Sequence, residues 1–274
     1  MLLARRAGTP RVECSLDLRR SSSMVELSED TWGWNGRQFP YPEKCKERTI
    51  YYWSGDGFAP VARYASSLVK LIPTDWGPPT FEIDGIKMLP TAHLSPYEDA
   101  RRKVSLIHPR GKVILDTCGG LGYFAAWCLR GQAAHVHSYE KNPDVMWLRD
   151  LNPWSPRPEE TLTLTQAGVE AGLEAFAGGS VEAILHDPPR FGIAGELYSQ
   201  QFYDQLARVL ARRGTLFHYT GSPNKIATGR DLPHEVSRRL RHAGFNTNIV
   251  GDGTVKAFQQ PISGAGTFYS VGVH

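Results

Sequence analysis

The residues best suited to chemistry follow an apolar run in the second half of the chain. The run Val181–Leu185 is followed by His-Asp187-Pro-Pro-Arg-Phe. Two consecutive prolines fix the backbone and remove two N–H donors, so the Asp187 carboxylate and the neighbouring carbonyls are held as acceptors. Such acceptors can hold the N–H groups of an amine and aim its lone pair at an electrophilic carbon. We therefore predict that Asp187 is the catalytic residue.

A glycine-rich loop forms the second candidate site, one for a nucleotide-like cofactor. The apolar segment Val113–Leu115 runs into Asp116-Thr-Cys-Gly-Gly-Leu-Gly122, where glycines let backbone amides approach a ligand closely. Glu140 ends the next predicted strand, where a carboxylate can accept hydrogen bonds from both ribose hydroxyls. Glycine loop, strand and terminal acid together predict a site for a cofactor that contains adenosine.

Two cofactors fit this loop, because the segment from Gly120 to Ala125 also has the GxGxxA form of a dinucleotide-binding loop. Asp116 distinguishes between the two cofactors. A carboxylate at the strand end repels a pyrophosphate, whereas it can help to hold the cationic ammonium group of S-adenosylmethionine. The sequence therefore favours S-adenosylmethionine over a dinucleotide, and the remaining alternative is that the glycines serve only a turn.

The loop resembles that of the class I S-adenosylmethionine-dependent methyltransferases, in which an acidic residue is followed by spaced glycines. Asp116, Gly120 and Gly122 match this pattern, and Cys118 stands where the first glycine is usual. The resemblance covers about residues 105–260. It implies an α/β fold with a Rossmann-like, seven-stranded methyltransferase sheet flanked by helices.

The same resemblance implies roles for individual residues. The methionine part of the cofactor is expected near Asp116 and the loop, and the ribose at Glu140. An acid that would contact adenine is not evident after the third strand, at Gln166-Ala-Gly168. The cofactor-binding residues predicted in this way are Asp116, Cys118, Gly119, Gly120, Gly122 and Glu140.

Other segments resemble the spermidine synthases, which share the methyltransferase core but transfer an aminopropyl group from decarboxylated S-adenosylmethionine to a polyamine. The segments Phe81–Met88 and Pro96-Tyr97-Glu98 are similar to their amino-terminal strands and to their tyrosine-bearing entry to the core. Asp187 and the segment Ala194–Tyr203 resemble their catalytic-loop aspartate and the helix after it. The resemblance extends over most of residues 80–220 and implies that Tyr97 also contacts the cofactor.

The chain departs from the spermidine synthases in two acids. It has Gly120 where they carry an aspartate in the glycine loop, and Arg190 where they carry a second loop aspartate. The Asp187 segment also resembles the Asp/Asn-Pro-Pro-aromatic motif of amino-directed methyltransferases, with Arg190 inserted before Phe191. We therefore predict a methyltransferase that uses S-adenosylmethionine and acts on an amine or another small nucleophilic acceptor. The alternatives are an aminopropyltransferase, an RNA-directed methyltransferase, and a binding module with a vestigial cofactor pocket.

The acceptor side of the cleft is expected at the ends of the fourth and fifth strands. We assign substrate binding to Arg190, Glu196, His218 and Tyr219. Three of these assignments have a structural alternative: His218 and Tyr219 can form a wall of the core, and Glu196 can be an acid favoured by a helix dipole. Tyr97 and His186 can equally pack in the core.

The elements that must position these residues change in character near residue 100. Residues 24–100 predict a small β-rich region on the substrate side, with its clearest signal at Asp84-Gly85 between two apolar segments. From Lys112 onward strands alternate with helices, which predicts a parallel sheet in a domain over residues 101–274. The longest predicted helix is Glu196–Arg213.

Length and charge indicate what kind of protein this is and where its net charge lies. The 274 residues, 41% of them hydrophobic, suffice for a buried core, and the longest apolar runs are strand-sized, so we predict a soluble, cytoplasmic protein. Residues 1–23 contain five arginines and two acids, Glu13 and Asp17, and so account for the whole net charge of +3. These residues are predicted to be a flexible basic tail, a transit segment, or sequence ahead of the true start.

The partners expected from these observations are small molecules. Because the chain beyond residue 23 is neutral overall, nucleic acid is less favoured than a small acceptor such as an amine or polyamine. The four cysteines and nine histidines show no metal-ligand spacing, so no metal is predicted. Association with a second copy of the chain stays open.

Overall fold

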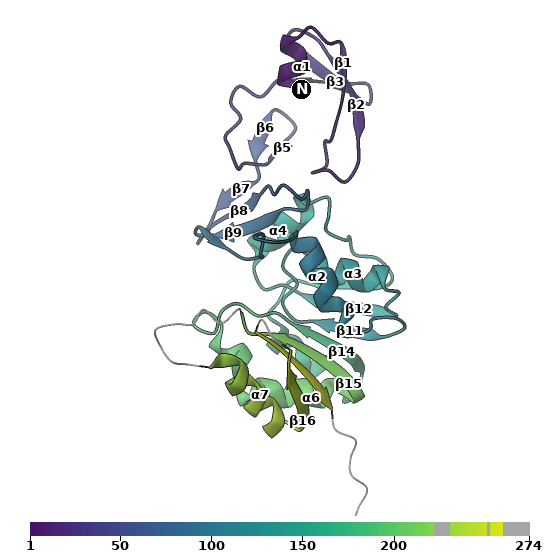
Figure 1. The fold of residues 1–274 in the computed structure, drawn as a ribbon, viewed down its shortest axis with the longest axis vertical. Coiled ribbons are helices and arrows are strands. Elements are labelled where there is room, and N and C mark those ends of the chain that lie inside the picture. Colours follow the sequence, from purple (N-terminus) through teal and green to yellow (C-terminus); the bar gives the residue numbers. More distant parts are fainter. Residues whose placement is uncertain (222–230, 251–252, 260–274) are drawn as a thin grey trace, which may run out of the picture. The chain divides into compact units, whose positions relative to one another are not determined.

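The structure is a computed structural model that describes residues 1–221, 231–250 and 253–259 (Figure 1). The chain divides into two compact units. The first comprises residues 1–102, 120–127 and 142–157, and the second comprises residues 103–119, 128–141 and the described residues from Pro158 onward.

The second unit is built on a seven-stranded sheet. Its strands are β11 (Val113–Asp116), β12 (His135–Tyr139), β13 (Leu162–Thr165), β14 (Val181–His186), β15 (Leu210–Tyr219), β16 (Phe245–Ile249) and β17 (Thr254–Gln259). They lie in the order β13-β12-β11-β14-β15-β17-β16, with β17 antiparallel to both neighbours and all other pairs parallel. The Rossmann-like sheet predicted from the sequence is confirmed. Its parallel strands end at one edge, where such sheets bind ligands.

Short helices of this unit follow the strands. They are α5 (Val169–Gly172), the 3-10 helices η1 (Leu173–Ala175) and η2 (Gly195–Tyr198), α6 (Gln200–Val209) and α7 (Leu232–His242). Leu206 of α6 and Leu240 of α7 are fully buried in one apolar cluster with Ile184 and Leu216 of the sheet. Burying a leucine side chain contributes roughly 1.5–3 kcal/mol, so this layer holds the helices against the strands.

The prediction of one helix over Glu196–Arg213 is wrong at both ends. The chain first forms η2, and α6 begins only after Ser199, whose hydroxyl accepts a hydrogen bond from the Phe202 amide at 3.1 Å. At its other end Leu210 leaves the helix to pair with Val181 as the start of β15. Strand pairing outweighs the helical periodicity of this segment, because propensity is a weak prior against tertiary contacts.

The first unit holds an antiparallel β region. Four strands form one sheet: β1 (Arg11–Cys14), β2 (Ser23–Leu27), β3 (Thr31–Trp34) and β4 (Arg37–Pro40). A hairpin of β5 (Tyr51–Trp53) and β6 (Phe58–Pro60) follows. A further sheet has the order β10-β9-β8-β7, formed by β7 (Ala62–Tyr64), β8 (Leu68–Ile72), β9 (Thr80–Ile83) and β10 (Ile86–Lys87). The predicted N-terminal β-rich region is therefore present.

Two local predictions in this unit can be compared with the structure. Asp84 and Gly85 both have positive φ, 49° and 79°, and turn β9 into β10 as a two-residue hairpin loop. Residues 1–23, for which the sequence predicts a flexible tail, hold helix α1 (Leu2–Arg6) and strand β1. The pairing of β1 with β2 explains this difference, since Val12 lies opposite Val25, a core residue of this sheet.

Three further helices complete the described chain: α2 (Pro96–Ser105), α3 (Tyr123–Arg130) and α4 (Pro143–Leu151). Helix α4 begins with a local cap, in which the Asn142 side chain accepts a hydrogen bond from the Asp144 amide at 2.8 Å and Pro143 occupies the first turn. Of the helices in the described ranges, none combines the length and the hydropathy needed to cross a membrane.

Candidate active site

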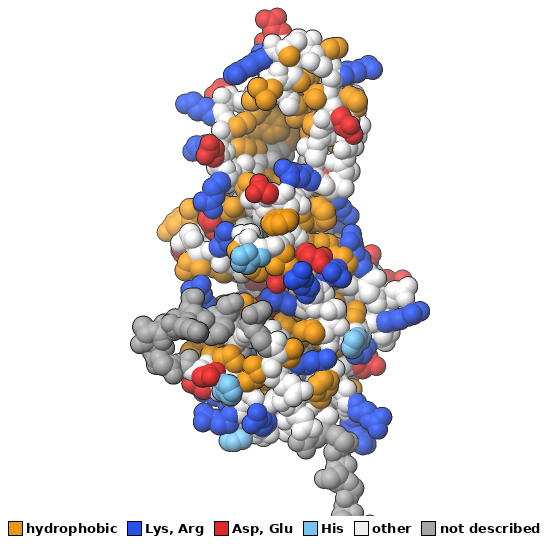
Figure 2. Space-filling model, in the orientation of Figure 1, with side chains coloured by type: hydrophobic (Ala, Val, Ile, Leu, Met, Phe, Trp, Pro, Cys, Tyr) orange, Lys and Arg blue, Asp and Glu red, His pale blue; other side chains and the backbone are white. Residues whose placement is uncertain are grey.

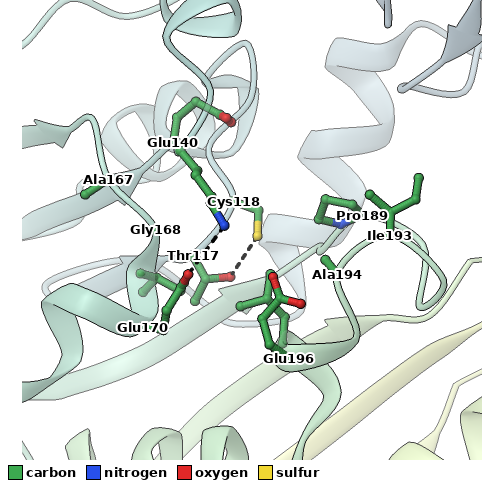
Figure 3. A pocket seen from close by; sticks show the side chains of 13 residues that line it. Thr117, Cys118, Glu140, Ala167, Gly168, Glu170, Pro189, Ile193, Ala194 and Glu196 are labelled. Carbon is green, nitrogen blue, oxygen red and sulfur yellow. Dashed lines mark hydrogen bonds and ion pairs between the residues drawn. The ribbon is translucent and has the colours of Figure 1, made fainter. Parts of the chain in front are cut away.

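A pocket of about 190 Å³ lies at the carboxyl ends of β11, β12, β13 and β14 (Figure 3). Every one of the four strand ends contributes to its walls. The lining residues are Thr117, Cys118, Glu140, Lys141, Ala167, Gly168, Val169, Glu170, Pro189, Ile193, Ala194, Glu196 and Leu197. The structure thus brings Cys118 and Glu140, from the predicted cofactor site, together with Glu196, from the predicted acceptor side.

Acidic side chains dominate the charge of this pocket. Glu140, Glu170 and Glu196 supply three carboxylates, and Lys141 supplies one ammonium, 3.8 Å from Glu170. A pyrophosphate would be repelled by this set, whereas ribose hydroxyls and a cationic sulfonium are compatible with it. The pocket therefore fits S-adenosylmethionine better than a dinucleotide.

Glu170 is a pocket residue that the sequence analysis missed. Glu170 lies two residues beyond Gln166-Ala-Gly168, because the chain turns at Gly168 into the short helix α5, whose first turn carries this acid. An acid just inside a helix that follows a strand was the available signal, since the helix N-terminus favours a carboxylate.

Asp116 lies behind the loop rather than in the pocket wall. It is 1% exposed, and its carboxylate accepts a hydrogen bond from the Ser138 hydroxyl at 2.8 Å. After it, the Gly119 amide donates to the Tyr139 carbonyl at 2.6 Å, which ties the loop to β12. Gly120 and Gly122 have positive φ, 50° and 79°, so both need the conformational freedom of glycine.

Gly122 has a packing reason for lacking a side chain. A Cβ atom there would lie 2.5 Å from Cζ of Arg149, whose side chain is buried. Arg149 comes from α4 of the same unit and was not predicted from the sequence. At this position the loop glycine makes room for a guanidinium group.

Hydrogen bonds of His186 join two segments of the pocket wall to the core. His186 is fully buried, and burial lowers its pKa to about 3, so its ring is neutral. One ring nitrogen, Nε2, faces the Leu197 carbonyl at 3.1 Å and must donate to it. The other, Nδ1, therefore accepts from the Thr117 hydroxyl at 2.7 Å. His186 thus fixes two segments of the pocket wall from behind.

Cys118 faces the pocket as an uncharged thiol. Burial raises its pKa well above the usual value, and the neighbouring carboxylates of Glu140, Asp116 and Asp187 raise it further. Its Sγ atom lies 3.7 Å from the Thr117 hydroxyl. A thiol held in this state is a compact, weakly polar surface and a poor nucleophile.

Asp187 is part of an arrangement that the sequence did not reveal. Its Oδ2 atom accepts a hydrogen bond from the Lys103 ammonium at 3.1 Å, in an ion pair whose side chains are 22% and 11% exposed. The same Nζ atom lies 4.0 Å from the ring centroid of Tyr219, over its face. Of the predicted residues, Asp187 and Tyr219 are therefore brought together, with Lys103 between them.

The Asp-Pro-Pro loop is anchored from below by Tyr198. The Tyr198 hydroxyl donates to the Pro189 carbonyl at 3.0 Å, and its ring packs edge-on against Phe191 at 5.3 Å. Arg239 of α7 donates to the Tyr198 carbonyl at 2.7 Å. Arg190 is exposed, and its carbonyl accepts from the Ile193 amide at 2.7 Å to turn the loop. Only the backbone of Arg190 has a defined role here.

Two predicted residues lie in packed surroundings instead of the pocket. His218 is fully buried, where Nε2 lies 3.0 Å from the Tyr203 hydroxyl. Tyr97 is 7% exposed and packs with other aromatic rings of its own unit, at 5.3 Å from Tyr123, 5.0 Å from Trp127 and 5.2 Å from Trp154. Both side chains therefore lie in a packed core, which was the alternative to a role in the site.

Sheet order and pocket position together define an α/β fold of the Rossmann-like methyltransferase class. No family model matches the chain. An uncharacterized protein of Methanocaldococcus jannaschii is 43% identical over 184 residues, which are 64% of this chain and 61% of that protein. The aligned part is thus less than two thirds of the relative's length.

Solved structures show a spermidine-synthase-like architecture. A spermidine synthase in complex with the transition-state analogue AdoDATO has a TM-score of 0.57 and 15% identity, and the match covers 77% of this chain and 79% of that one. Spermidine synthase from Thermotoga maritima has a TM-score of 0.54 and 15% identity, with 80% of both chains covered. At this identity the likeness establishes the fold, and this is the fold that the sequence predicted.

Proposed function

We propose that the chain is an S-adenosylmethionine-dependent methyltransferase that acts on an amine or another small nucleophile. The observation that carries the proposal is the acidic pocket at the carboxyl ends of four parallel strands, beside the glycine loop. Ligands of open α/β sheets bind at this edge. The carboxylates in the wall favour a cationic cofactor over one that carries phosphates.

The residues of the candidate site divide into two groups by what they would hold. Glu140 directly follows β12 and would accept hydrogen bonds from the ribose hydroxyls, while the neutral Cys118 thiol would pack beside the cofactor. Asp187 and the carbonyls of its loop would accept hydrogen bonds from the N–H groups of an acceptor. S-adenosylmethionine supplies a methyl carbon activated by the positive sulfur, so alignment in a dry pocket is the main task left to the protein.

Aminopropyl transfer is the second candidate, because the spermidine synthase fold supports it. The chain nevertheless has Gly120 and Arg190 at the two positions where that family is expected to carry aspartates. An RNA acceptor is a third candidate. In the face shown in Figure 2, acidic side chains lie among the basic ones, which is not the continuous basic track that RNA backbones attract.

Calorimetric titration tests the proposal directly. The purified chain is titrated with S-adenosylmethionine, S-adenosylhomocysteine, decarboxylated S-adenosylmethionine and NAD. We expect micromolar binding of the first two and none of NAD. Glu140→Gln should weaken S-adenosylmethionine about tenfold, because it removes the acceptor charge opposite the ribose hydroxyls. Preference for the decarboxylated form would support aminopropyl transfer, and no binding of any of the three sulfur compounds would contradict the proposed function.

A further inference from the structure

The ion pair of Lys103 and Asp187 limits which acceptor can bind beside Asp187. Lys103 comes from helix α2, Asp187 from the loop after β14, and Tyr219 from the end of β15. Their approach places the Lys103 ammonium 3.1 Å from the carboxylate and 4.0 Å from the aromatic ring centroid. Three elements distant in sequence thus converge on one cation.

A carboxylate beside the face of an aromatic ring is a typical binding site for an ammonium group. Here both features are already engaged by an ammonium group of the chain itself. The two charged side chains are only 11% and 22% exposed, so solvent screens their attraction weakly. A second cation at this position would meet the positive charge of Lys103 and gain little from Asp187.

We propose, building on the proposed methyl transfer, that this site selects an acceptor whose reacting nitrogen is uncharged at neutral pH, such as an aromatic amino group, and excludes alkylammonium acceptors such as polyamines. Lys103 is then a specificity-determining residue. It occupies the position that the ammonium group of a diamine would need.

The chemistry of the transfer is consistent with this choice. An alkylamine with a pKa of about 10 is protonated at neutral pH and must lose a proton before its lone pair can react. Asp187, whose negative charge is stabilised by Lys103, is poorly suited to remove that proton. An aromatic amino group already has a free lone pair, which forms the new N–C bond as the S–C bond breaks and leaves its electron pair on sulfur. The arylammonium nitrogen formed in this way is a much stronger acid than an alkylammonium, so it can pass its proton even to the weakly basic Asp187.

Diamine binding before and after removal of the Lys103 charge tests the inference. Putrescine is titrated into the wild-type chain, Lys103→Met, Lys103→Arg and the double variant Lys103→Met with Asp187→Asn. We expect no measurable binding to wild type or Lys103→Arg. Binding to Lys103→Met should be at least tenfold tighter, because the positive charge that repels the diamine beside Asp187 is removed, and the double variant should lose this gain.

Two results would overturn the inference. One is tight putrescine binding to the wild-type chain, and the other is a folded Lys103→Met variant that binds putrescine no better than wild type. Thermal melts establish folding, with Lys103→Gln as a second uncharged variant. If neither uncharged variant folds, the wild-type titration decides alone: putrescine binding overturns the inference, and its lack supports it.

The same titrations separate this inference from the proposed function. They are run with and without S-adenosylhomocysteine. A chain that binds no S-adenosylhomocysteine contradicts the proposed methyltransferase, while the comparison of putrescine affinities still reports whether Lys103 fills a cation site.

Discussion

At the scale of single residues, the behaviour of the candidate site depends on which charges face each other. Two prolines follow Asp187 and restrict its backbone, and Lys103 forms an ion pair with its carboxylate. Cys118 lies in the pocket wall as an uncharged thiol, since burial and nearby carboxylates raise its pKa. The carboxylate that we propose for the acceptor is thus one whose charge is compensated, and the nearby thiol is not expected to compete as a nucleophile.

Asp187→Asn tests the role of that carboxylate. The amide keeps the shape and one acceptor but cannot take a proton, so we expect turnover to fall about 100-fold. S-adenosylmethionine affinity, measured by calorimetry, should change less than about threefold, because Asp187 is not expected to hold the cofactor. Asp204→Asn, an exposed carboxylate on α6, is the matched control and should leave turnover unchanged. Unchanged turnover in Asp187→Asn would remove the residue from the mechanism.

At the scale of elements, short connections position the candidate site. The loop between β11 and α3 needs left-handed conformations at Gly120 and Gly122, and Gly122 also makes room for Arg149. The loop after β14 is fixed by the Tyr198 hydroxyl on the Pro189 carbonyl. The Tyr198 hydroxyl thus supports its loop by a hydrogen bond, whereas at Gly122 the loop backbone packs directly against a buried guanidinium.

Gly122→Ala and Gly111→Ala separate backbone strain from steric overlap. Both glycines have positive φ, 79° and 71°, so alanine should cost about 1 kcal/mol at either position. At Gly122 the new Cβ also overlaps the Arg149 guanidinium, whereas at Gly111 nothing lies within 4 Å. Urea unfolding should show a loss for Gly122→Ala that is roughly 1–3 kcal/mol larger than for the control. Equal losses would show that Arg149 moves away freely.

At the scale of the whole molecule, two buried histidines make the fold sensitive to acid. The rings of His186 and His218 lie 4.4 Å apart in the core of the second unit. Burial lowers the pKa of His186 from 6.5 to about 3, and burial together with His186 lowers the pKa of His218 well below 6.5. Protonation of either ring would bury a charge, which is costly.

The pH dependence of stability follows from these shifts. Above pH 6.5 both histidines are neutral in the folded and unfolded chains, so their contribution is complete. As the pH falls from 6.5 towards 3, the unfolded chain takes up protons that folded His186 does not, so each such histidine lowers the free energy of unfolding by about 1.4 kcal/mol per pH unit. Urea unfolding between pH 7 and pH 5 measures this slope.

His186→Gln should reduce the slope, and His93→Gln, at an exposed loop position, should leave it unchanged. A slope that is the same in wild type and His186→Gln would show that His186 does not resist protonation in the folded chain.

Much of the fold and of the cofactor side could be predicted from the sequence, because the signals there are local. Alternating strands and helices predict a parallel sheet, and in such a sheet the strand ends that carry Cys118 and Glu140 must meet at one edge. The Asp84-Gly85 turn and the Asn142 cap are likewise set by neighbouring residues, since their hydrogen bonds and φ angles close within a few positions.

Other features were decided only by the tertiary structure, because their partners are distant in the sequence. Lys103 reaches Asp187 across 84 positions, and no pattern around either residue indicates the pair. His218 and Tyr97 carry types that suit a site, yet packing buries them. The end of α6 was misplaced because the pairing of Leu210 with Val181 outweighs helical periodicity. The sequence by itself thus determined where the strands end and which acids follow them, whereas long-range packing decided which side chains are buried and which charges are compensated.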